Sequence, residues 1–230
     1  MRLLIALLIP AVGLVATAAQ AAERAFTIPA PTLDQTTKAD KETVVLAGGC
    51  FWGVQAVFQH TKGVTSAVSG YAGGDKSTAH YETVGTGRTG HAESVAVTFD
   101  PRQISLGKIL QIYFSVAHNP TELNRQGPDL GTQYRSAIFY ADDEQKKVAA
   151  AYVAELDKAK VFPSPVVTQI EPLRGFYPAE DYHQDFAVLH PSYPYIVFND
   201  LPKVDNLKRL FAADYRETPV TVMAASKPGE

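Results

Sequence analysis

The sequence predicts an α+β fold, a two-layer sandwich in which amphipathic helices cover one mixed β-sheet, related to the ferredoxin-like arrangement. Three observations predict it. Short β-prone runs alternate with helical stretches between residues 43 and 170, and two of those stretches carry a single apolar stripe. Aromatic residues, prolines and short polar runs crowd residues 176–201, so we expect a long irregular C-terminal segment there.

The first half of the chain supplies three predicted strands and a short helix. Residues 43–47 form an apolar run, and residues 54–58 soon after it have helical character. Residues 64–71 are β-prone and are followed by glycines. Residues 93–99 alternate cleanly between larger and smaller side chains, which is typical of a half-buried strand, and Asp100-Pro101 ends it.

Two longer helices follow. Apolar residues at i, i+3, i+4, i+7, i+8 and i+11 within residues 106–117 predict an amphipathic helix, with Ser105 as its N-cap. Asp142 with Gln145 three positions later indicates a capping box, which opens a helix with an apolar side within residues 148–156. The remaining predicted strands are residues 136–140 and 166–170, and Pro172 closes the second.

The N-terminus has the build of a secretory signal peptide, which we assign to residues 1–21. Arg2 precedes an apolar run, and small residues lead to Ala19-Gln20-Ala21, an A-x-A cleavage pattern. A retained membrane anchor is the alternative, but Pro10 and the shortness of the run argue against it, because about 20 residues are needed to cross the hydrocarbon core. We therefore expect an exported protein, in a bacterial periplasm or secreted.

Three segments are expected after the cleavage site. Residues 22–41 form a polar linker, residues 42–215 one domain with a sizeable core, and residues 216–230 a flexible tail. The 21 basic and 24 acidic residues give no electrostatic case for nucleic acid or an anionic membrane, so we expect a small-molecule or peptide partner. We also expect a monomer. The histidines lack zinc-type spacing, so no metal site is predicted.

Cys50 is the only cysteine of the chain, so no internal disulfide can form. It lies within Gly48-Gly49-Cys50-Phe51-Trp52-Gly53, at the predicted seam between a strand and a helix. The first turn of a helix has unpartnered N–H groups and a partial positive charge, which favour a thiolate. The glycines permit close approach of a substrate, and the two rings supply an apolar wall. Cys50 is therefore a candidate nucleophile for a small apolar group.

Other interpretations of Cys50 stay open at this point. A lone cysteine is commonly a buried and inert small hydrophobe. A cysteine hydrolase or acyltransferase is also compatible with the sequence, because its histidine base is usually distant along the chain.

Glu93 is a candidate general acid. It shares one face of its predicted strand with Val95, Val97 and Phe99, so its carboxyl would point to the apolar side and keep its proton. An equally open alternative is that Glu93 lies at a loose strand end and faces water. The polar loop 124–135 is a candidate ligand-binding loop or a plain surface connection.

Six short motifs in order resemble the peptide methionine sulfoxide reductase A family, between about residues 43 and 195. They are Gly49-Cys50-Phe51-Trp52-Gly53, Gly70-Tyr71-Ala72-Gly73-Gly74, Thr89-Gly90-His91-Ala92-Glu93, Leu123-Asn124-Arg125-Gln126-Gly127, Gln133-Tyr134-Arg135-Ser136 and Ala179-Glu180-Asp181-Tyr182-His183-Gln184. The resemblance implies reduction of methionine S-sulfoxide, free or within peptides and proteins, in the repair of oxidative damage.

The resemblance also implies roles for individual residues. Cys50 matches the family's nucleophile and Glu93 its proton donor. The positions implied to bind substrate are Tyr81 and Tyr134 for the sulfoxide oxygen, Phe51 and Trp52 for the methyl group, and Asp129 as a supporting acid.

The implied reaction is attack of Cys50 on the sulfoxide sulfur, which leaves Cys50 as a sulfenic acid. Family members often carry further cysteines that resolve this acid, one of them where Gly85 stands here. Because this chain has none, we expect an external thiol reductant, either a thioredoxin-like protein or a small thiol. We also expect no bound cofactor. A non-enzymatic alternative is a sulfoxide-peptide binding or thiol-linked surface protein.

Overall fold

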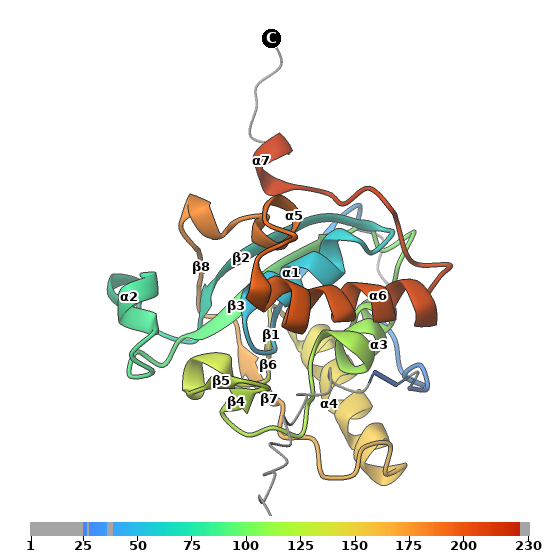
Figure 1. Cartoon of the computed structure of the whole chain (residues 1–230). Coiled ribbons are helices and arrows are strands. Elements are labelled where there is room, and N and C mark those ends of the chain that lie inside the picture. Colours follow the sequence, from blue (N-terminus) through green and yellow to red (C-terminus); the bar gives the residue numbers. More distant parts are fainter. Residues whose placement is uncertain (1–24, 27, 36–38, 226–230) are drawn as a thin grey trace, which may run out of the picture.

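The structure is a computed structural model that describes residues 25–26, 28–35 and 39–225. At its centre is a six-stranded mixed sheet of order β7-β6-β1-β3-β2-β8, so β1 and β3 are its middle strands (Figure 1). Neighbouring strands are antiparallel except β6 and β7, which are parallel. The strands are β1 (Glu42–Ala47), β2 (Val64–Ala72), β3 (Ala92–Phe99), β6 (Ala137–Tyr140), β7 (Gln169–Pro172) and β8 (Phe176–Pro178), with a separate ribbon of β4 (Arg125–Gln126) and β5 (Asp129–Leu130).

Four longer helices pack against this sheet and against one another. They are α1 (Phe51–Gln59), α3 (Leu106–Ile112), α4 (Asp143–Lys158) and α6 (Leu201–Leu210). Shorter elements are α2 (Tyr81–Val84), α5 (Phe186–Leu189), α7 (Val222–Ala225), π-helical turns at Tyr113–Ala117 and Ile196–Asp200, and 3-10 turns at Lys76–Thr78, Thr132–Tyr134 and Asp181–His183. Among the described residues, no helix is both long and apolar enough to span a bilayer.

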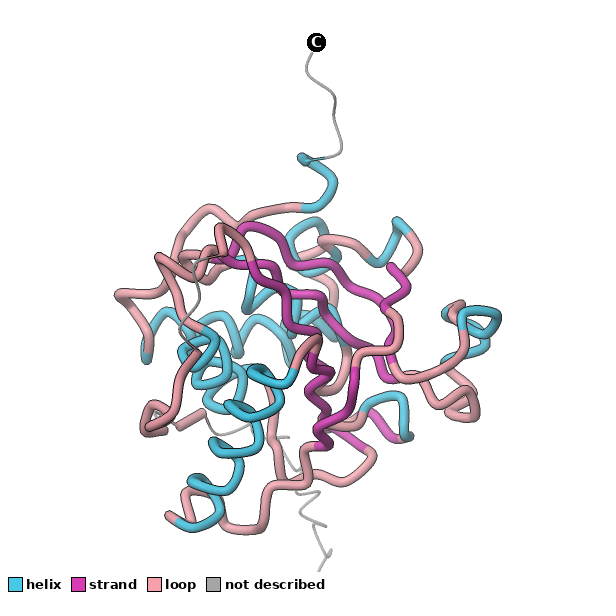
Figure 2. The backbone as a smooth tube through the Cα atoms, turned by 180° about the vertical axis from the view of Figure 1, so that it is seen from behind, coloured by secondary structure: helices cyan, strands magenta, loops and turns pink. Residues whose placement is uncertain are grey.

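The strands separate two buried clusters, as the alternation of their side chains requires. Val44 and Leu46 of β1 belong to the main core with residues of all four longer helices, whereas Val45 and Ala47 face a smaller cluster with Phe139. Figure 2 shows the strands from behind as one curled sheet. The predicted two-layer α+β architecture is confirmed.

The predicted helix starts are also present. The Ser105 hydroxyl accepts a hydrogen bond from the Lys108 amide at 3.2 Å, and the Asp142 carboxylate accepts one from the Gln145 amide at 2.8 Å. The Gln145 side chain bonds the Ala141 amide rather than that of Asp142, so the predicted capping box closes one residue earlier. These bonds satisfy amides that the first turn of a helix leaves without partners.

Two expectations for the C-terminal third need correction. The predicted strand 166–170 lies three residues later, at Gln169–Pro172, and includes the proline that was expected to end it. As an outer strand of the sheet, β7 tolerates a residue without an N–H. The segment expected to be irregular contains β8, α5 and a π-helical turn, and α6 after it was not predicted.

The segments that flank the predicted domain lie against it where the structure describes them. Ile28, within the expected linker, is 1% exposed, and its carbonyl accepts a bond from the Gln111 side chain at 2.7 Å. At the other end, where a flexible tail was expected, the Val220 amide donates to the Gln59 carbonyl at 3.1 Å. The predicted signal peptide, residues 1–21, lies outside the described residues.

A buried carboxylate fixes the C-terminal segment. Asp185, 1% exposed, accepts bonds from the Gln59 side chain at 2.6 Å and from the amides of Val222 and Met223 at 3.0 and 2.9 Å. Its own backbone is left-handed, with φ of 57°, a conformation that aspartate tolerates better than most residues. One side chain therefore ties α1 to the end of the described chain.

We predict that Asp185→Ala lowers the free energy of unfolding by about 2–4 kcal/mol, because it leaves three donors without their acceptor. Urea unfolding measures the loss, and amide hydrogen exchange would show faster exchange at Val222 and Met223. Asp181→Ala, at an exposed acid nearby, is the matched control. Equal stability of the two variants would contradict this role of Asp185.

Candidate active site

Cys50 is the N-cap of α1, directly after the central strand β1, as the sequence predicts. Its backbone, with φ of −54° and ψ of 125°, turns the chain from strand to helix. Gly49 before it has φ of +87°, a region that favours glycine. A Cβ added to Gly49 would lie 2.6 Å from Cγ of Gln126, so the loop that carries β4 and β5 packs directly on this turn.

A pocket of about 190 Å³ opens at Cys50. Residues from five separate parts of the chain line it: the start of α1, the start of α2, the start of β3, the β5 to 3-10 segment and the residue before the second π-helical turn. They are Cys50, Phe51, Trp52, Tyr81, Glu93, Asp129, Tyr134 and Tyr195. All seven residues singled out from the sequence therefore line one pocket, together with Tyr195, which was not singled out.

Glu93 lies on β3, the neighbour of β1, and is 3% exposed. Its Oε2 accepts a hydrogen bond from the Phe51 amide at 3.1 Å, so the carboxyl caps the first turn of α1 from a distant part of the chain. Burial raises the pKa of Glu93 to about 8, against the opposing effect of the Phe51 N–H. The carboxyl is thus mostly protonated at neutral pH, and the alternative in which it faces water is wrong.

The sequence argument for a resting Cys50 thiolate is corrected by the structure. Burial raises the pKa of the thiol well above its usual value, and the negative charges of Glu93, once it has ionised at higher pH, and of Asp200 and Asp129 raise it further. A hydrogen bond from the Trp52 amide acts in the opposite direction, as expected at a helix start, but is the smaller effect. The effect of desolvation on the thiol pKa is therefore larger than that of the helix terminus. The thiol keeps its proton when no substrate is bound.

Tyr81 and Tyr134 bring two hydroxyl groups to the pocket. The pKa of each hydroxyl is raised. Burial is the largest cause of the rise, and the charge of Glu93 is the second largest. Both hydroxyls therefore stay protonated across the physiological range and are available to donate hydrogen bonds. Together with the Glu93 carboxyl, they make a set of donors around the sulfur.

Asp129 and Tyr195 form a pair at the same pocket. The Tyr195 hydroxyl donates a short hydrogen bond to Oδ2 of Asp129. The pKa of Asp129 is raised by burial, and this bond and the charge of Lys203 counteract the rise. Tyr195 was not identified from the sequence because it lies among eleven tyrosines, in a segment without regular periodicity.

The apolar wall is an ordered stack of rings. Trp52 stacks on Phe186 at a centroid distance of 3.9 Å and meets Tyr193 and Tyr195 edge to face at 6.3 and 6.0 Å. Its Nε1–H donates to Nδ1 of His183 at 3.2 Å. The indole is therefore held by a stacked ring, by two edge-to-face contacts and by a hydrogen bond from its nitrogen.

The segment 179–184 supports this pocket from behind. The Glu180 carboxylate accepts bonds from the Tyr71 hydroxyl at 2.8 Å and the Tyr81 amide at 3.0 Å, which places α2 at the pocket. The Gln184 side chain bonds Gln55 of α1 and the backbone of Ser69 in β2. The motif 179–184, singled out in the sequence analysis, thus supports the pocket indirectly, because it positions α1, β2 and the start of α2.

Neither a histidine base nor a metal cluster is found at Cys50 within the described ranges. No histidine lines the pocket. His183 already accepts the indole N–H, and burial lowers the pKa of His118 to about 3. No group of three or more His, Cys, Asp or Glu side chains that could hold a metal is present among the described residues.

Comparison with known proteins places this chain in a family. A model of the family described as peptide methionine sulfoxide reductase matches residues 42–215. A relative from Mesorhizobium japonicum, peptide methionine sulfoxide reductase MsrA 2, is 64% identical over 194 residues, which are 84% of this chain and all of the relative. A Synechocystis relative with the same description is 46% identical over 80% of this chain and 88% of its own.

Two solved structures have the same fold. Mxr1 of Saccharomyces cerevisiae in its reduced form has a TM-score of 0.61 and 32% identity, covering 70% of this chain and 92% of its own. Methionine sulfoxide reductase A of Corynebacterium diphtheriae has a TM-score of 0.58 and 31% identity, covering 77% and 92%. The chain is therefore an oxidoreductase that belongs to the peptide methionine sulfoxide reductase family.

Proposed function

We propose that the protein reduces methionine S-sulfoxide, free or within peptides and proteins, by transfer of the sulfoxide oxygen to Cys50. One observation carries the proposal: a thiol and a protonated carboxyl share a pocket of about 190 Å³ with two tyrosine hydroxyls and two aromatic rings. A methyl sulfoxide has an oxygen that accepts hydrogen bonds, an electrophilic sulfur and an apolar methyl. The pocket offers a complementary group for each.

Glu93, Tyr81 and Tyr134 are the donors proposed for the sulfoxide oxygen, and Phe51 and Trp52 are proposed to enclose the methyl group. Protonation of the oxygen by Glu93 makes the sulfur more electrophilic as Cys50 attacks it. The proton that the thiol releases returns to the Glu93 carboxylate, so the acid ends as it began. The sulfoxide sulfur gains two electrons, Cys50 loses two, and the products are methionine and a Cys50 sulfenic acid.

Recovery of Cys50 is proposed to use an external thiol, since the chain has no second cysteine. One thiol attacks the sulfenic sulfur and releases water, which leaves a mixed disulfide on Cys50. A second thiol then attacks this disulfide and frees the Cys50 thiol. The reductant is a thioredoxin-like protein or a small thiol, and nothing but these thiols is needed besides the substrate.

We propose in addition that the mature protein acts outside the cytoplasm. The support is the signal-like pattern of residues 1–21 in the sequence. Fractionation of cells that express the full chain, with the N-terminal residue of the product determined, tests the location. An intact N-terminus in the cytoplasmic fraction would rule out export.

Cys50→Ser is expected to abolish reduction of the S epimer, because an alcohol is far less nucleophilic than a thiol and cannot take up the oxygen. The measurement is methionine release with excess dithiothreitol, together with the intact mass after one cycle without reductant. The unaltered protein should gain one oxygen on Cys50. Release of methionine by the serine variant, or an acyl adduct in place of the oxygen, would contradict the proposal.

The activity is expected to depend on the proton of Glu93. Since the pKa of this carboxyl is about 8, the acid form dominates below that pH, and kcat/KM for the S epimer should fall as pH rises through it. Glu93→Gln keeps the size and the pocket but has no proton to transfer, so kcat should fall by a factor of about 10² or more. A rate profile in which the glutamine variant keeps the same alkaline limb would contradict the assignment.

Tyr195→Phe is expected to reduce kcat/KM by about tenfold. The substitution removes the hydrogen bond from the Tyr195 hydroxyl to Asp129, so the Asp129 carboxylate is held less firmly at the pocket. Steady-state kinetics with the S epimer measures the change. Tyr193→Phe is the matched control, since this half-exposed ring contacts Trp52 but does not line the pocket. The same loss in both variants would mean that the bond to Asp129 has no special role.

A further inference from the structure

A buried ion pair lies against the first turn of α1. Asp200 is the last residue of the second π-helical turn and is fully buried, and Lys203 in the first turn of α6 is 7% exposed. Nζ of Lys203 lies 3.5 Å from Oδ1 of Asp200. Neither residue belongs to any of the motifs on which the family resemblance rests.

The pair touches the helix that begins at Cys50. A Cβ added at Gly53 would clash with Oδ1 of Asp200 and would lie 3.0 Å from Nζ of Lys203. Gly53 is the third residue of α1, so the two charges lie within one helical turn of the thiol. Glycine at this position lets the carboxylate approach the backbone that carries Cys50.

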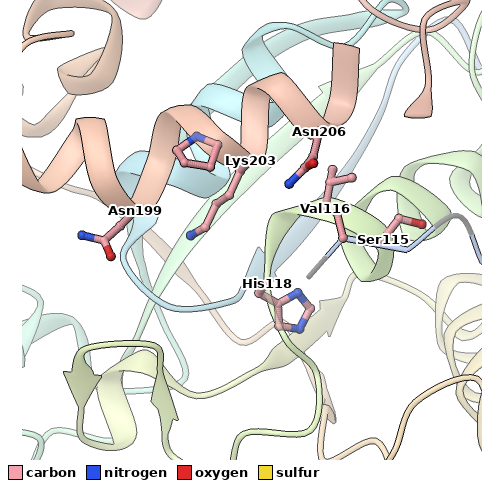
Figure 3. A pocket seen from close by; sticks show the side chains of 8 residues that line it. Ser115, Val116, His118, Asn199, Lys203 and Asn206 are labelled. Carbon is pink, nitrogen blue, oxygen red and sulfur yellow. The ribbon is translucent and has the colours of Figure 1, made fainter. Parts of the chain in front are cut away.

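Lys203 is one of the residues that line a second, small cavity. Figure 3 shows Lys203 extending from α6 on the side that faces His118. This cavity of about 20 Å³ is large enough for one water molecule. Burial keeps His118 neutral at physiological pH. Lys203 is therefore the positively charged residue among those that line this cavity.

A buried ion pair is weak evidence for stability, because the cost of desolvating two charges can exceed their attraction. Replacement of such a pair by apolar residues is often neutral or stabilising. The position of the pair suggests another role, since Asp200 is among the charges that raise the pKa of Cys50 and Lys203 is among those that lower the pKa of Asp129.

We propose that Asp200 and Lys203 are positioning residues that restrain the reactivity of Cys50 in the empty site: Asp200 places a negative charge beneath the thiol, and Lys203 holds and partly offsets that charge. The inference rests on Cys50 being the nucleophile of the proposed function. A thiol restrained in this way is protected from oxidants and alkylating agents until a substrate enters.

Several other titratable groups face Cys50 and must be unchanged in any test. From the elements packed around it these are Glu93 of β3, Asp129 of β5, Tyr81 of α2, Tyr134 of the 3-10 turn and Tyr195.

The test is the rate of Cys50 alkylation by iodoacetamide as a function of pH in the substrate-free protein. Asp200→Asn leaves the ammonium unbalanced near the thiol, so the midpoint of the alkylation profile should fall by about one pH unit, a tenfold change in the thiolate fraction below it. The double variant Asp200→Asn, Lys203→Met removes both charges, and its midpoint should lie between those of the single variant and the unaltered protein.

Asp205→Asn and Lys208→Met, at exposed positions of α6, are matched controls that should leave the midpoint unchanged. A loosened structure would also lower the midpoint, because it exposes the thiol to water, but it would do so in the double variant at least as much as in the single variant. A double-variant midpoint below that of the single variant would therefore overturn the proposal, as would an unchanged profile in the single variant. Equal midpoints in the single and double variants would refute the role of Lys203. Because alkylation needs no sulfoxide, this outcome is independent of whether the proposed reduction occurs.

Discussion

The hydrogen bond from the Phe51 amide to the Glu93 carboxyl is the interaction on which the site depends. It joins the start of α1 to the middle strand β3, and so brings the acid of Glu93 and the thiol of Cys50, which are distant in sequence, into one pocket. A protonated carboxyl accepts this bond on one oxygen and still has a proton to give on the other. The same contact therefore caps the helix and orients the acid.

Burial keeps both the Cys50 thiol and the Glu93 carboxyl protonated when no substrate is bound. A carboxyl and a thiol in a poorly solvated pocket each favour the neutral form, and each would disfavour the other's charge. A sulfoxide oxygen changes this balance because it takes up the proton of the acid. In this account, reactivity at Cys50 is produced by the substrate and is not a standing property of the helix terminus.

Much of the fold and site was predictable because the signals are local. The stripe of residues 106–117, the alternation of residues 93–99 and the Gly-Cys-Phe-Trp-Gly turn each specify their own structure. The alternation offered a buried Glu93 carboxyl as one of two open positions, and the structure has the buried one. The predictions that were wrong concern features that depend on distant residues. The protonation state of Cys50 follows from its burial by four other segments, and the bounds of β7 follow from its pairing with β6.

The C-terminal third was the least predictable part for the same reason. Tyr195, Asp200 and Lys203 acquire their importance only when α1 lies beside them, and the ten residues of α6 show a proline at the second position as their clearest local signal. The described residues after 215 pack on α1 through a carboxylate, Asp185, whose partners lie far along the chain. Composition alone suggested a tail.

The central claim is that Glu93 holds a proton at neutral pH because it is buried at the start of α1. Infrared difference spectra of the unaltered protein against Glu93→Gln, recorded as a function of pH, measure that proton directly through the carboxylic acid C=O stretch. The account predicts an acid band that persists at neutral pH and is lost around pH 8. A band lost near the ordinary carboxyl value of about 4.3 would contradict it.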